Sequence, residues 1–472
     1  MKRTILTSLA LLLLSLLPAR AADSYSHYYQ GLPIDIRQVT PITFPDRTAS
    51  ITAHGAVGDG VTLCTTAIQH TIDSLAALGG GTVTIPMGVW LTGPIELRDN
   101  INLSLDRNAI LYFSPDKTLY IDPNPKATRV KACISATRCT NIGITGSGMI
   151  DGNGSQWRPV KRGKVSNVEW NDFKAMGGVE RDNGSLWYPW ELRSGYEDVA
   201  ATPEKQEKKR NDLFRVFYCE NILLEGVTFQ NAPKFHVHPF NSRNIIMDGI
   251  TVRCPWNAQN GDAIDLSDCH QALIVNSTVD AGDDGLCLKS GTRKDGTDIN
   301  GVADVLMRYN TVYHAHGAFV IGSEDICGID RVVATDCRFS GTDTGLRFKS
   351  AIGRGGKTSD IYLYNIMMAD IRGEAIIFEC SYADRPAGSK AGDTPAAKEL
   401  VNVPEFKDIK IYDIICRGCK TGIKATGIQG MDCVHDIDIS NSTIVYRNAP
   451  TAIDSATARI NLTDVRLNPN KK

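Results

Sequence analysis

Carboxylates gather in one short stretch of the chain, residues 260–289. Asp262 lies 21 residues before Asp283, and Asp284 follows directly. A separation of this length is typical of one coil of a solenoid, in which equivalent positions of successive coils lie above one another. We therefore expect the three carboxylates to face one cleft, where they could serve as general acid and general base.

Two further polar clusters follow at similar distances. His316 lies 32 residues after Asp284, and Arg347 lies 31 residues after His316, so each cluster fits one further coil with a modest insertion. Arg347 and Lys349 are two residues apart and would share one face of a strand, with Phe348 on the other face. Two cations on one face suit a carboxylated ligand, because Arg binds it through two hydrogen bonds and Lys as a point charge.

The local sequence predicts how the carboxylates reach the cleft. Asn260 and Asp262 are two residues apart and would project from one face of an extended strand. Glycines flank the Asp283–Asp284 pair and permit a bent backbone, which would let both side chains reach one site. A lone Asp-Asp pair is more often a turn or a calcium ligand, so the order of the four clusters along successive coils is what indicates a catalytic site.

Short apolar runs recur along the chain and predict stacked β-strands. Most begin with Asn or Asp, and they start at Asn221, Asn244, Ala272, Asp304, Asp360, Asp408 and Asp436. One coil cannot bury its own apolar face, so coils stack and pair their strands about 4.8 Å apart. The pattern predicts an all-β fold, a single-stranded right-handed parallel β-helix. The irregular intervals and the scarcity of two-residue hairpin turns favour this solenoid over a β-barrel or a propeller.

One helix is predicted near the start of the chain, over residues 65–78. Thr65 or Thr66 could cap it, and Gly79–Gly81 would end it. Its apolar residues fall near helical spacing; they are Ala67, Ile68, Ile72, Leu75 and Leu78. We expect this N-terminal helix to close one end of the solenoid, whose terminal coil would otherwise expose its apolar core.

The first residues are typical of an export signal. Met1–Arg3 precede an apolar run, Ile5–Leu17, that ends in Ala19–Ala21. We expect residues 1–21 to be a signal peptide and residues 22–472 to form a single catalytic domain, in the periplasm or outside the cell. The apolar run is short for a membrane span, so no membrane insertion is expected.

Composition narrows the possible partners. The 472 residues carry a net charge of −2, and no basic field emerges that would suit nucleic acid or an anionic membrane. Thirteen cysteines are scattered along the chain. In an exported protein they invite a disulfide framework, but their apolar surroundings favour mostly free, buried thiols. We expect a monomer.

The sequence resembles the polygalacturonases of glycoside hydrolase family 28. The resemblance covers most of the chain after residue 21 and rests on Asn260-Gly261-Asp262, Gly282-Asp283-Asp284, His316-Gly317 and Arg347-Phe348-Lys349. An early Gly58-Asp59-Gly60 motif is shared more widely among pectin-active β-helices. The departures from the family pattern, at Gly261, Ala315 and Phe348, remove no ionisable group.

The resemblance implies hydrolysis of α-1,4-linked galacturonic acid in pectin, with inversion at the anomeric carbon. Asp283 would be the general acid, and Asp262 and Asp284 would activate the attacking water. His316 would help to set the protonation of the acid. Electrostatics supports this assignment of an acid and a base, because like charges repel and clustered carboxylates do not all ionise, so one is kept protonated.

The resemblance also implies how a pectic chain or oligogalacturonide is held. Arg347 and Lys349 would bind the uronate carboxylate beside the scissile bond, and Asn260 would contribute to substrate binding. His236 and His238 could contact sugar hydroxyls. No metal and no cofactor is expected, since these histidines lack a third ligand.

Two long stretches interrupt the strand pattern, near residues 155–211 and 381–404. We interpret both as loop insertions, since long loops in compact domains are commonly functional. If they wall off one end of the cleft, the enzyme would act from a chain end. Tryptophans of the first insertion either line the cleft or pack internally; they are Trp157, Trp170, Trp187 and Trp190.

Three alternatives stay open. A rhamnogalacturonan hydrolase of the same family would share the carboxylates. A pectate lyase would use a similar solenoid with calcium and yield an unsaturated product. A carbohydrate-binding β-helix would need the groove and no chemistry.

Overall fold

The computed structural model describes residues 25–124, 130–189, 210–291, 300–382 and 402–470. The predicted signal peptide, residues 1–21, and most of the insertion predicted near 381–404 lie outside these ranges. No helix within the described residues is long and apolar enough to cross a membrane.

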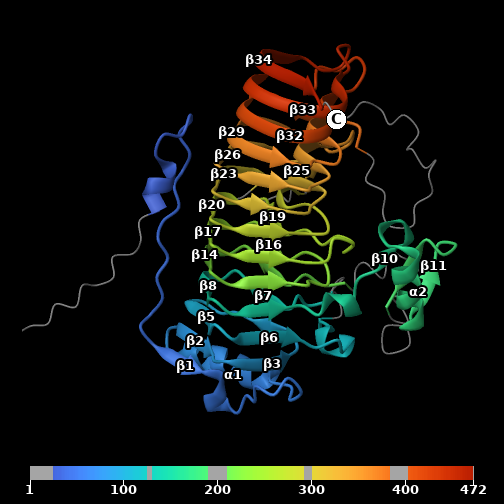
Figure 1. The fold of residues 1–472 in the computed structure, drawn as a ribbon. Coiled ribbons are helices and arrows are strands. Elements are labelled where there is room, and N and C mark those ends of the chain that lie inside the picture. Colours follow the sequence, from blue (N-terminus) through green and yellow to red (C-terminus); the bar gives the residue numbers. More distant parts are fainter. Residues whose placement is uncertain (1–24, 125–129, 190–209, 292–299, 383–401, 471–472) are drawn as a thin grey trace, which may run out of the picture.

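The chain winds into a right-handed parallel β-helix whose coils stack along one axis (Figure 1). Each coil contributes strands to three sheets, which we call sheets 1, 2 and 3. Sheet 1 contains β4 (Ile95–Glu96), β7 (Ile134–Thr137), β13 (Phe214–Phe217), β16 (Val237–Phe240), β19 (Ile264–Ser267), β22 (Leu286–Ser290), β25 (Gly317–Asp325), β28 (Thr344–Lys349) and β30 (Glu374–Glu379).

The other two sheets complete the coils. Sheet 2 contains β1 (Thr48–Ser50), β2 (Gly81–Ile85), β5 (Ile101–Leu105), β8 (Thr140–Gly146), β14 (Glu220–Glu225), β17 (Arg243–Asp248), β20 (His270–Val275), β23 (Val302–Arg308), β26 (Ile329–Thr335) and β29 (Lys357–Ala369). Sheet 3 contains β3 (Gly88–Thr92), β6 (Ala109–Phe113), β9 (Met149–Asp151), β15 (Thr228–Gln230), β18 (Thr251–Arg253), β21 (Thr278–Asp280), β24 (Thr311–Val312) and β27 (Arg338–Ser340).

The last coils have longer strands that continue from one sheet into the next. They are β32 (Ile409–Thr426), β33 (Ile437–Ile453) and β34 (Ile460–Pro469), with the short β31 (Glu405–Phe406) beside β29. The predicted fold is therefore confirmed, because the strands pair in parallel from coil to coil.

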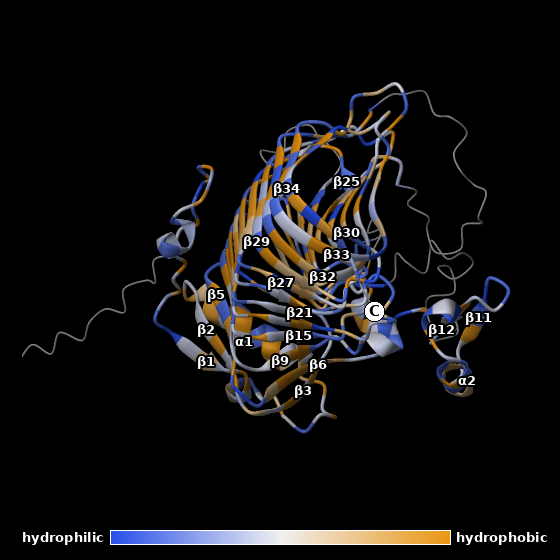
Figure 2. Cartoon of the chain, turned by 45° about the horizontal axis from the view of Figure 1, so that its top comes forward, coloured by the Kyte–Doolittle hydropathy of each residue, from blue (hydrophilic) through white to orange (hydrophobic). Residues whose placement is uncertain are grey.

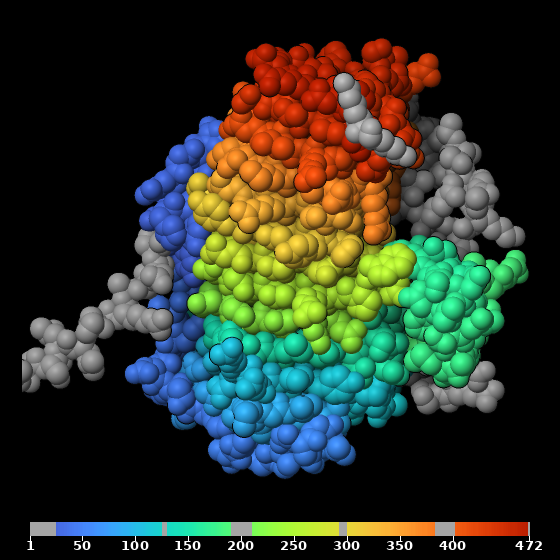
Figure 3. Space-filling view, in the orientation of Figure 1, coloured from blue at the N-terminus to red at the C-terminus, as the bar shows by residue number. Residues whose placement is uncertain are grey.

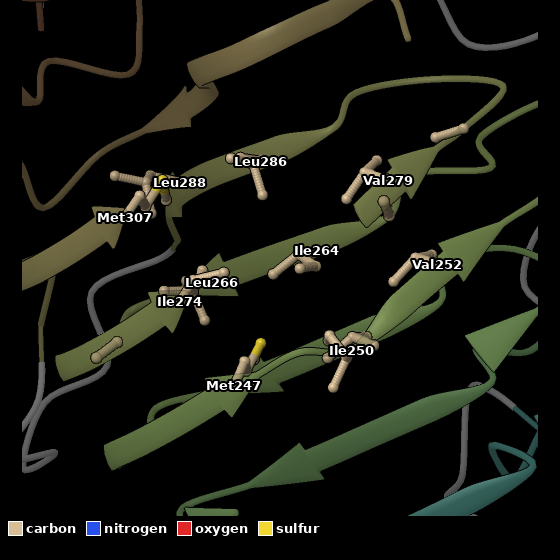
Figure 4. Packing of buried hydrophobic residues seen from close by; sticks show 14 of the residues in the cluster. Met247, Ile250, Val252, Ile264, Leu266, Ile274, Val279, Leu286, Leu288 and Met307 are labelled. Carbon is tan, nitrogen blue, oxygen red and sulfur yellow. The ribbon is translucent and has the colours of Figure 1, made fainter. Parts of the chain in front are cut away.

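Apolar side chains fill the interior of the solenoid and stack from coil to coil (Figure 4). Met247 pairs with Ile274, which pairs with Met307, and Ile264 pairs with Leu286 in the same way. All five side chains are fully buried, and each contributes about 1.5–3 kcal/mol of hydrophobic stabilisation. Figure 2 shows hydrophobic colours along the strands and hydrophilic colours at many turns.

A position at or near the start of many strands of sheet 2 explains the recurring Asn and Asp. Residues at this position have positive φ, a conformation that Asn and Asp tolerate better than most residues; examples are Asn221 (61°), Asn244 (52°), Asp304 (58°), Asp360 (56°), Asp408 (51°) and Asp436 (51°). The side chains also form a ladder, in which Asn244 donates to Asn221 and Asn221 donates to Asn141, each at 2.7 Å.

The predicted end cap is α1 (Thr65–Ala77), which buries Ile68, Ile72 and Leu75 against the first coils. The predicted cap by a threonine is wrong. Cys64 is the N-cap residue and its side chain makes no capping hydrogen bond; Thr65 instead accepts a hydrogen bond from the backbone of Gly93.

The segment before the first coil runs along the outside of sheet 2 (Figure 1). It begins with η1 (Tyr25–Tyr29) and buries apolar side chains against the outer face of that sheet; this cluster includes Tyr29, Ile36, Val39, Leu223, Ile246, Leu273, Leu306 and Val333.

The described part of the insertion near 155–211 is a small folded unit and not the loop that the sequence predicts. It contains β10 (Val160–Lys161), α2 (Asn167–Ala175), β11 (Val179–Arg181) and β12 (Leu186–Tyr188), with antiparallel pairing. Trp170 and Trp187 form its core, and Trp157 packs on Tyr120. These tryptophans pack internally, and Trp190 lies outside the described residues.

The cysteines match the prediction. All thirteen are free, and most are buried. Nine of them are buried members of the solenoid core cluster, where they pack as small apolar side chains.

Candidate active site

The candidate site lies along the turns that lead from sheet 3 to sheet 1. We call these the site turns; they are residues 231–236, 254–263, 281–285, 313–316 and 341–343. Backbone hydrogen bonds join them rung by rung: His236 N donates to Asp262 O (3.0 Å), Ala263 N to Asp284 O (2.9 Å) and His316 N to Asp283 O (2.9 Å). The stacking brings the predicted carboxylates onto adjacent rungs of one edge.

Asp283 contacts the imidazole of His316 on the next site turn. Asp283 Oδ1 lies 2.9 Å from His316 Nδ1, and the Asp283 side chain is only 13% exposed. Burial alone would raise the pKa of Asp283, but the hydrogen bond and charge of His316, together with Lys349 and Lys164, hold it below its ordinary value. Asp283 is therefore tied to a proton-carrying partner.

Asp284 lies against the predicted cationic pair. Lys349 Nζ is 2.7 Å from Asp284 Oδ2, and an Arg347 guanidinium nitrogen is 3.7 Å from Oδ1. Burial would lower the pKa of Lys349, yet the charge of Asp284 raises it above its ordinary value. Phe348 points into the core and stacks on Phe378 with ring centroids 4.4 Å apart, so the predicted alternation along β28 is confirmed.

Asp262 is buried one rung before the Asp283–Asp284 pair. Its Oδ2 accepts a hydrogen bond from Lys289 Nζ at 3.0 Å, and the same ammonium lies 3.1 Å from Asp265 Oδ2. Burial raises the pKa of Asp262 well above its ordinary value; Lys289 opposes this effect, while Asp265 and the two neighbouring carboxylates add to it. Burial therefore disfavours the charged form of Asp262.

Sequence reasoning missed Asp265 and Lys289. Both lie within the stretch that carries the predicted carboxylates, but an isolated Lys on a strand has no pattern that marks it as buried. The structure pairs β19 with β22 so that Ser267 lies beside Lys289, and the Lys289 ammonium lies 4.5 Å from the Phe235 ring centroid.

Three carboxylate oxygens of this cluster are buried without a hydrogen-bond partner among the described residues. They are Oδ1 of Asp262, of Asp265 and of Asp284. Buried acceptors without partners are costly.

The predicted sugar contacts of two histidines do not fit the structure. His236 is fully buried; its Nε2 accepts from Ala232 N (3.2 Å), so Nδ1 carries the proton and donates to Asp262 O (2.8 Å). Burial lowers the pKa of His236 to about 4. This histidine fixes the backbone that carries Asp262 and stays neutral.

His238 is occupied in a similar way. Its Nδ1 lies 3.2 Å from Asp212 Oδ2 and its Nε2 lies 3.0 Å from Ser267 Oγ. Because both ring nitrogens face buried protein groups, His238 has no nitrogen left to offer a sugar hydroxyl. His238 lies on β16 and is buried.

Asn260 and the glycines act differently from the prediction. Asn260 has a φ of 51°, so it belongs to a turn and shares no extended face with Asp262; its Oδ1 accepts from Arg210 at 2.8 Å. A Cβ at Gly282 would lie 2.6 Å from Ala258 O. Gly282 is thus required for close packing of the site turns.

One group of side chains has the spacing of metal ligands. Within the described residues, atoms of Asp283, Asp284 and His316 lie within 4.8 Å of one another. Lys349 and His316 already face these carboxylates, so a divalent cation would have to compete with an ammonium in place. The charges of the site fit proton transfer better than metal binding.

The comparisons with known proteins agree with this geometry. The model for "Glycosyl hydrolases family 28" matches residues 161–446, more than half of the chain. The chain is 27% identical over 433 residues to an exo-poly-alpha-D-galacturonosidase of Dickeya chrysanthemi, covering 88% of this chain and 70% of the relative. It is 26% identical over 338 residues to an endo-polygalacturonase of Pectobacterium carotovorum, covering 69% of this chain and 70% of the relative.

A solved structure is similar over nearly the whole fold. The hyperthermoactive exopolygalacturonase of Thermotoga maritima superposes with a TM-score of 0.72 at 26% identity, covering 92% of this chain and 94% of that chain. The family match spans the rungs that carry Asp262, Asp283, Asp284, His316, Arg347 and Lys349. The chain therefore belongs to glycoside hydrolase family 28, and the protein is a glycoside hydrolase.

Proposed function

We propose that the protein is a polygalacturonase that hydrolyses α-1,4-linked galacturonic acid in pectic chains, with inversion at the anomeric carbon. The observation that carries the proposal is the juxtaposition of the Asp283–Asp284 pair with Arg347 and Lys349. Carboxylates supply the acid and the base of a glycosidase. The two cations form a site for a uronate carboxylate, which a neutral sugar would not need.

Asp283 protonates the leaving glycosidic oxygen. In the free enzyme the Asp283–His316 pair holds its proton jointly across the 2.9 Å contact, and such pairs titrate as a unit. Once Asp283 has given up the proton, His316 stabilises the carboxylate that remains.

Asp284 and Asp262 activate the attacking water. Asp284 is held by Lys349 and Arg347 in the free enzyme. A uronate that binds these two cations draws Lys349 away from Asp284, and this frees the carboxylate to accept a proton from water. In inverting enzymes acid and base lie about 6.5–9.5 Å apart, with the water between them; in the free enzyme a carboxylate oxygen of Asp283 lies within 4.8 Å of one of Asp284.

We further propose that the enzyme acts from a chain end. The support is the folded insertion, which lies beside the site turns (Figure 3), together with the similarity to the exo-acting relatives described above. The chain is also similar to an endo-polygalacturonase, so polymer viscosity is compared with the release of reducing ends. A collapse of viscosity before reducing ends accumulate would exclude exo action.

A product profile on defined oligomers tests the function. The proposal expects oligogalacturonides to be cleaved, rhamnogalacturonan oligomers to be left intact, chelator to have no effect and no ultraviolet-absorbing product to form. An unsaturated product would indicate a lyase, and cleavage of rhamnogalacturonan would indicate the other hydrolase. Binding without new reducing ends would indicate a carbohydrate-binding protein.

We also propose that residues 22–472 form one catalytic domain of an exported monomer, released after removal of residues 1–21. The proposal that the protein is exported rests on the sequence of the first residues. N-terminal sequencing of the natively produced protein and its elution volume in gel filtration test these points.

A further inference from the structure

Lys164 connects the insertion to the candidate site. It ends the short η5 helix (Arg162–Lys164), and its Nζ lies 3.1 Å from His316 Nε2 and 3.2 Å from Gly282 O. The insertion occupies the turn between β9 and β13, which is the turn just before residues 231–236 and leads from sheet 3 to sheet 1 like the site turns. It can therefore reach across several rungs to His316.

The contact constrains the imidazole. An ammonium offers three donors and no acceptor, so a charged Lys164 requires Nε2 of His316 to accept. The ring proton then lies on Nδ1, which donates to Asp283 Oδ1 at 2.9 Å. In this arrangement His316 is neutral and holds Asp283 in place.

The position of the proton matters for the proposed chemistry. An imidazolium next to Asp283 would keep that carboxylate ionised, as its hydrogen bond and charge lower the pKa of Asp283. A cation already bound to Nε2 removes the lone pair that would form the imidazolium and repels the added charge. A proton that the pair binds is then directed to the free oxygen of Asp283 and not to Nε2 of His316, although the charge of Lys164 also weakens proton binding by Asp283.

We propose that Lys164 is a positioning residue of this enzyme: by donating to Nε2 of His316 it fixes the imidazole as a neutral Nδ1–H donor and leaves the catalytic proton on Asp283. The inference deepens the proposed function, since the pair in question is the proposed acid. It makes the insertion part of the catalytic apparatus in addition to any effect on access to the cleft.

Other charged groups also face His316 and Lys164. Asp343 Oδ2 lies 4.0 Å from His316 Nε2 and pairs with Arg372 at 3.6 Å. A cavity of about 160 Å³ on this side is also lined by His314, which pairs with Asp280. Lys161 acts on Lys164 from within the insertion, and burial lowers the pKa of Lys164. Of these groups, only Lys164 and Asp283 lie within hydrogen-bond distance of the ring.

The test compares Lys164→Met, Lys164→Arg and the wild type. Imidazole nitrogen NMR of the free enzyme, assigned with His316→Gln, reports the tautomer of His316. In Lys164→Met we expect the Nδ1–H tautomer of the neutral ring to lose its dominance, because the donor to Nε2 is lost. Lys164→Arg should restore this tautomer.

Activity gives the second readout. Loss of the Lys164 cation strengthens proton binding by the Asp283–His316 pair. In Lys164→Met the basic limb of the pH profile of kcat/KM therefore moves to higher pH. kcat falls at least about tenfold because the proton then resides on His316, while KM changes less. Lys174→Met is the matched control, because it removes the same charge from the same insertion and Lys174 contacts Glu180 on its exposed surface.

An unchanged His316 tautomer together with an unchanged pH profile of activity in Lys164→Met would overturn the inference. Failure of Lys164→Arg to restore the tautomer in a folded protein would overturn it as well. The NMR result needs no substrate, so a wild type with the expected tautomer but no activity on oligogalacturonides would contradict the proposed function and leave this inference standing.

Discussion

Asp262 and Asp283 lie on neighbouring site turns and are both largely buried, yet their pKa values move in opposite directions. Burial raises the pKa of Asp262 well above its ordinary value, and the Lys289 ammonium does not offset it because Asp265 shares that cation. The pKa of Asp283 is lowered, because His316 overcomes the effect of burial. In these two aspartates the charged neighbours, more than the extent of burial, decide the direction in which the pKa is shifted.

The largest expected effect separates the roles of these two residues. Asp283→Asn should lower kcat on oligogalacturonides by about 10²–10⁴-fold, since an amide cannot donate the proton. An aryl galacturonide with a good leaving group should recover much of that loss. Asp262→Asn should not be rescued in this way if Asp262 acts on the attacking water.

The matched control is Asp280→Asn, which removes a half-exposed carboxylate paired with His314 and should retain nearly full activity. Rescue of Asp262→Asn, with no rescue of Asp283→Asn, would exchange the two roles and make the carboxylate with the raised pKa the acid.

Lys289→Met sharpens the comparison by removing the cation that Asp262 and Asp265 share. Breaking a buried pair from one side costs about 3–5 kcal/mol, so the free energy of unfolding should fall by that order at neutral pH. Both aspartates have pKa values raised above those of the unfolded chain, so protonation favours the folded state. The loss should therefore shrink as the pH falls toward 4.

Chemical denaturation at several pH values measures this effect. The double variant Lys289→Met with Asp265→Asn should recover part of the stability, since one of the two orphaned charges is gone. A loss that does not depend on pH would argue against buried ionised carboxylates as its cause.

His236→Gln tests the rung that supports Asp262. The pKa of His236 is lowered to about 4 by burial, whereas an unfolded His titrates near 6.5. The folded state thus binds fewer protons, so its stability falls as the pH drops below about 6.5, reaching a loss of about 3 kcal/mol near pH 4. The variant should lack this part of the acid-induced loss, and parallel stability curves for the two proteins would contradict the buried neutral imidazole.

The smallest effect is expected at an exposed pair with the same rung-to-rung arrangement. Arg243 and Glu220 are 2.9 Å apart on neighbouring strands, but their side chains are 47% and 43% exposed. Arg243→Ala should change the free energy of unfolding by no more than about 1 kcal/mol. A loss as large as that of Lys289→Met would mean that burial does not distinguish the two pairs.

The sequence predicted the fold and much of the site because both follow from local patterns. Period-two alternation places Arg347 and Lys349 outward and Phe348 inward, and Asn or Asp at positive φ marks several strands of sheet 2. These features depend on neighbouring residues and on coil length, and both can be read from one amino-acid sequence.

The missed features depend on stacking between distant segments. His236 and His238 alternate like cleft residues, but the next rung covers them. Lys289 looks like a solvated strand residue in the sequence, but in the structure its ammonium lies between Asp262 and Asp265. Lys164 comes from an insertion 152 residues before His316, a distance that no periodicity spans.

In the proposed mechanism, Asp283 donates a proton to the glycosidic oxygen while water, activated by the carboxylates beside it, attacks the opposite face of the sugar. NMR of the first product formed from an α-linked galacturonate oligomer, recorded before mutarotation, tests this most directly. We predict the β-anomer at the new reducing end. The α-anomer, or an unsaturated uronate, would contradict the mechanism.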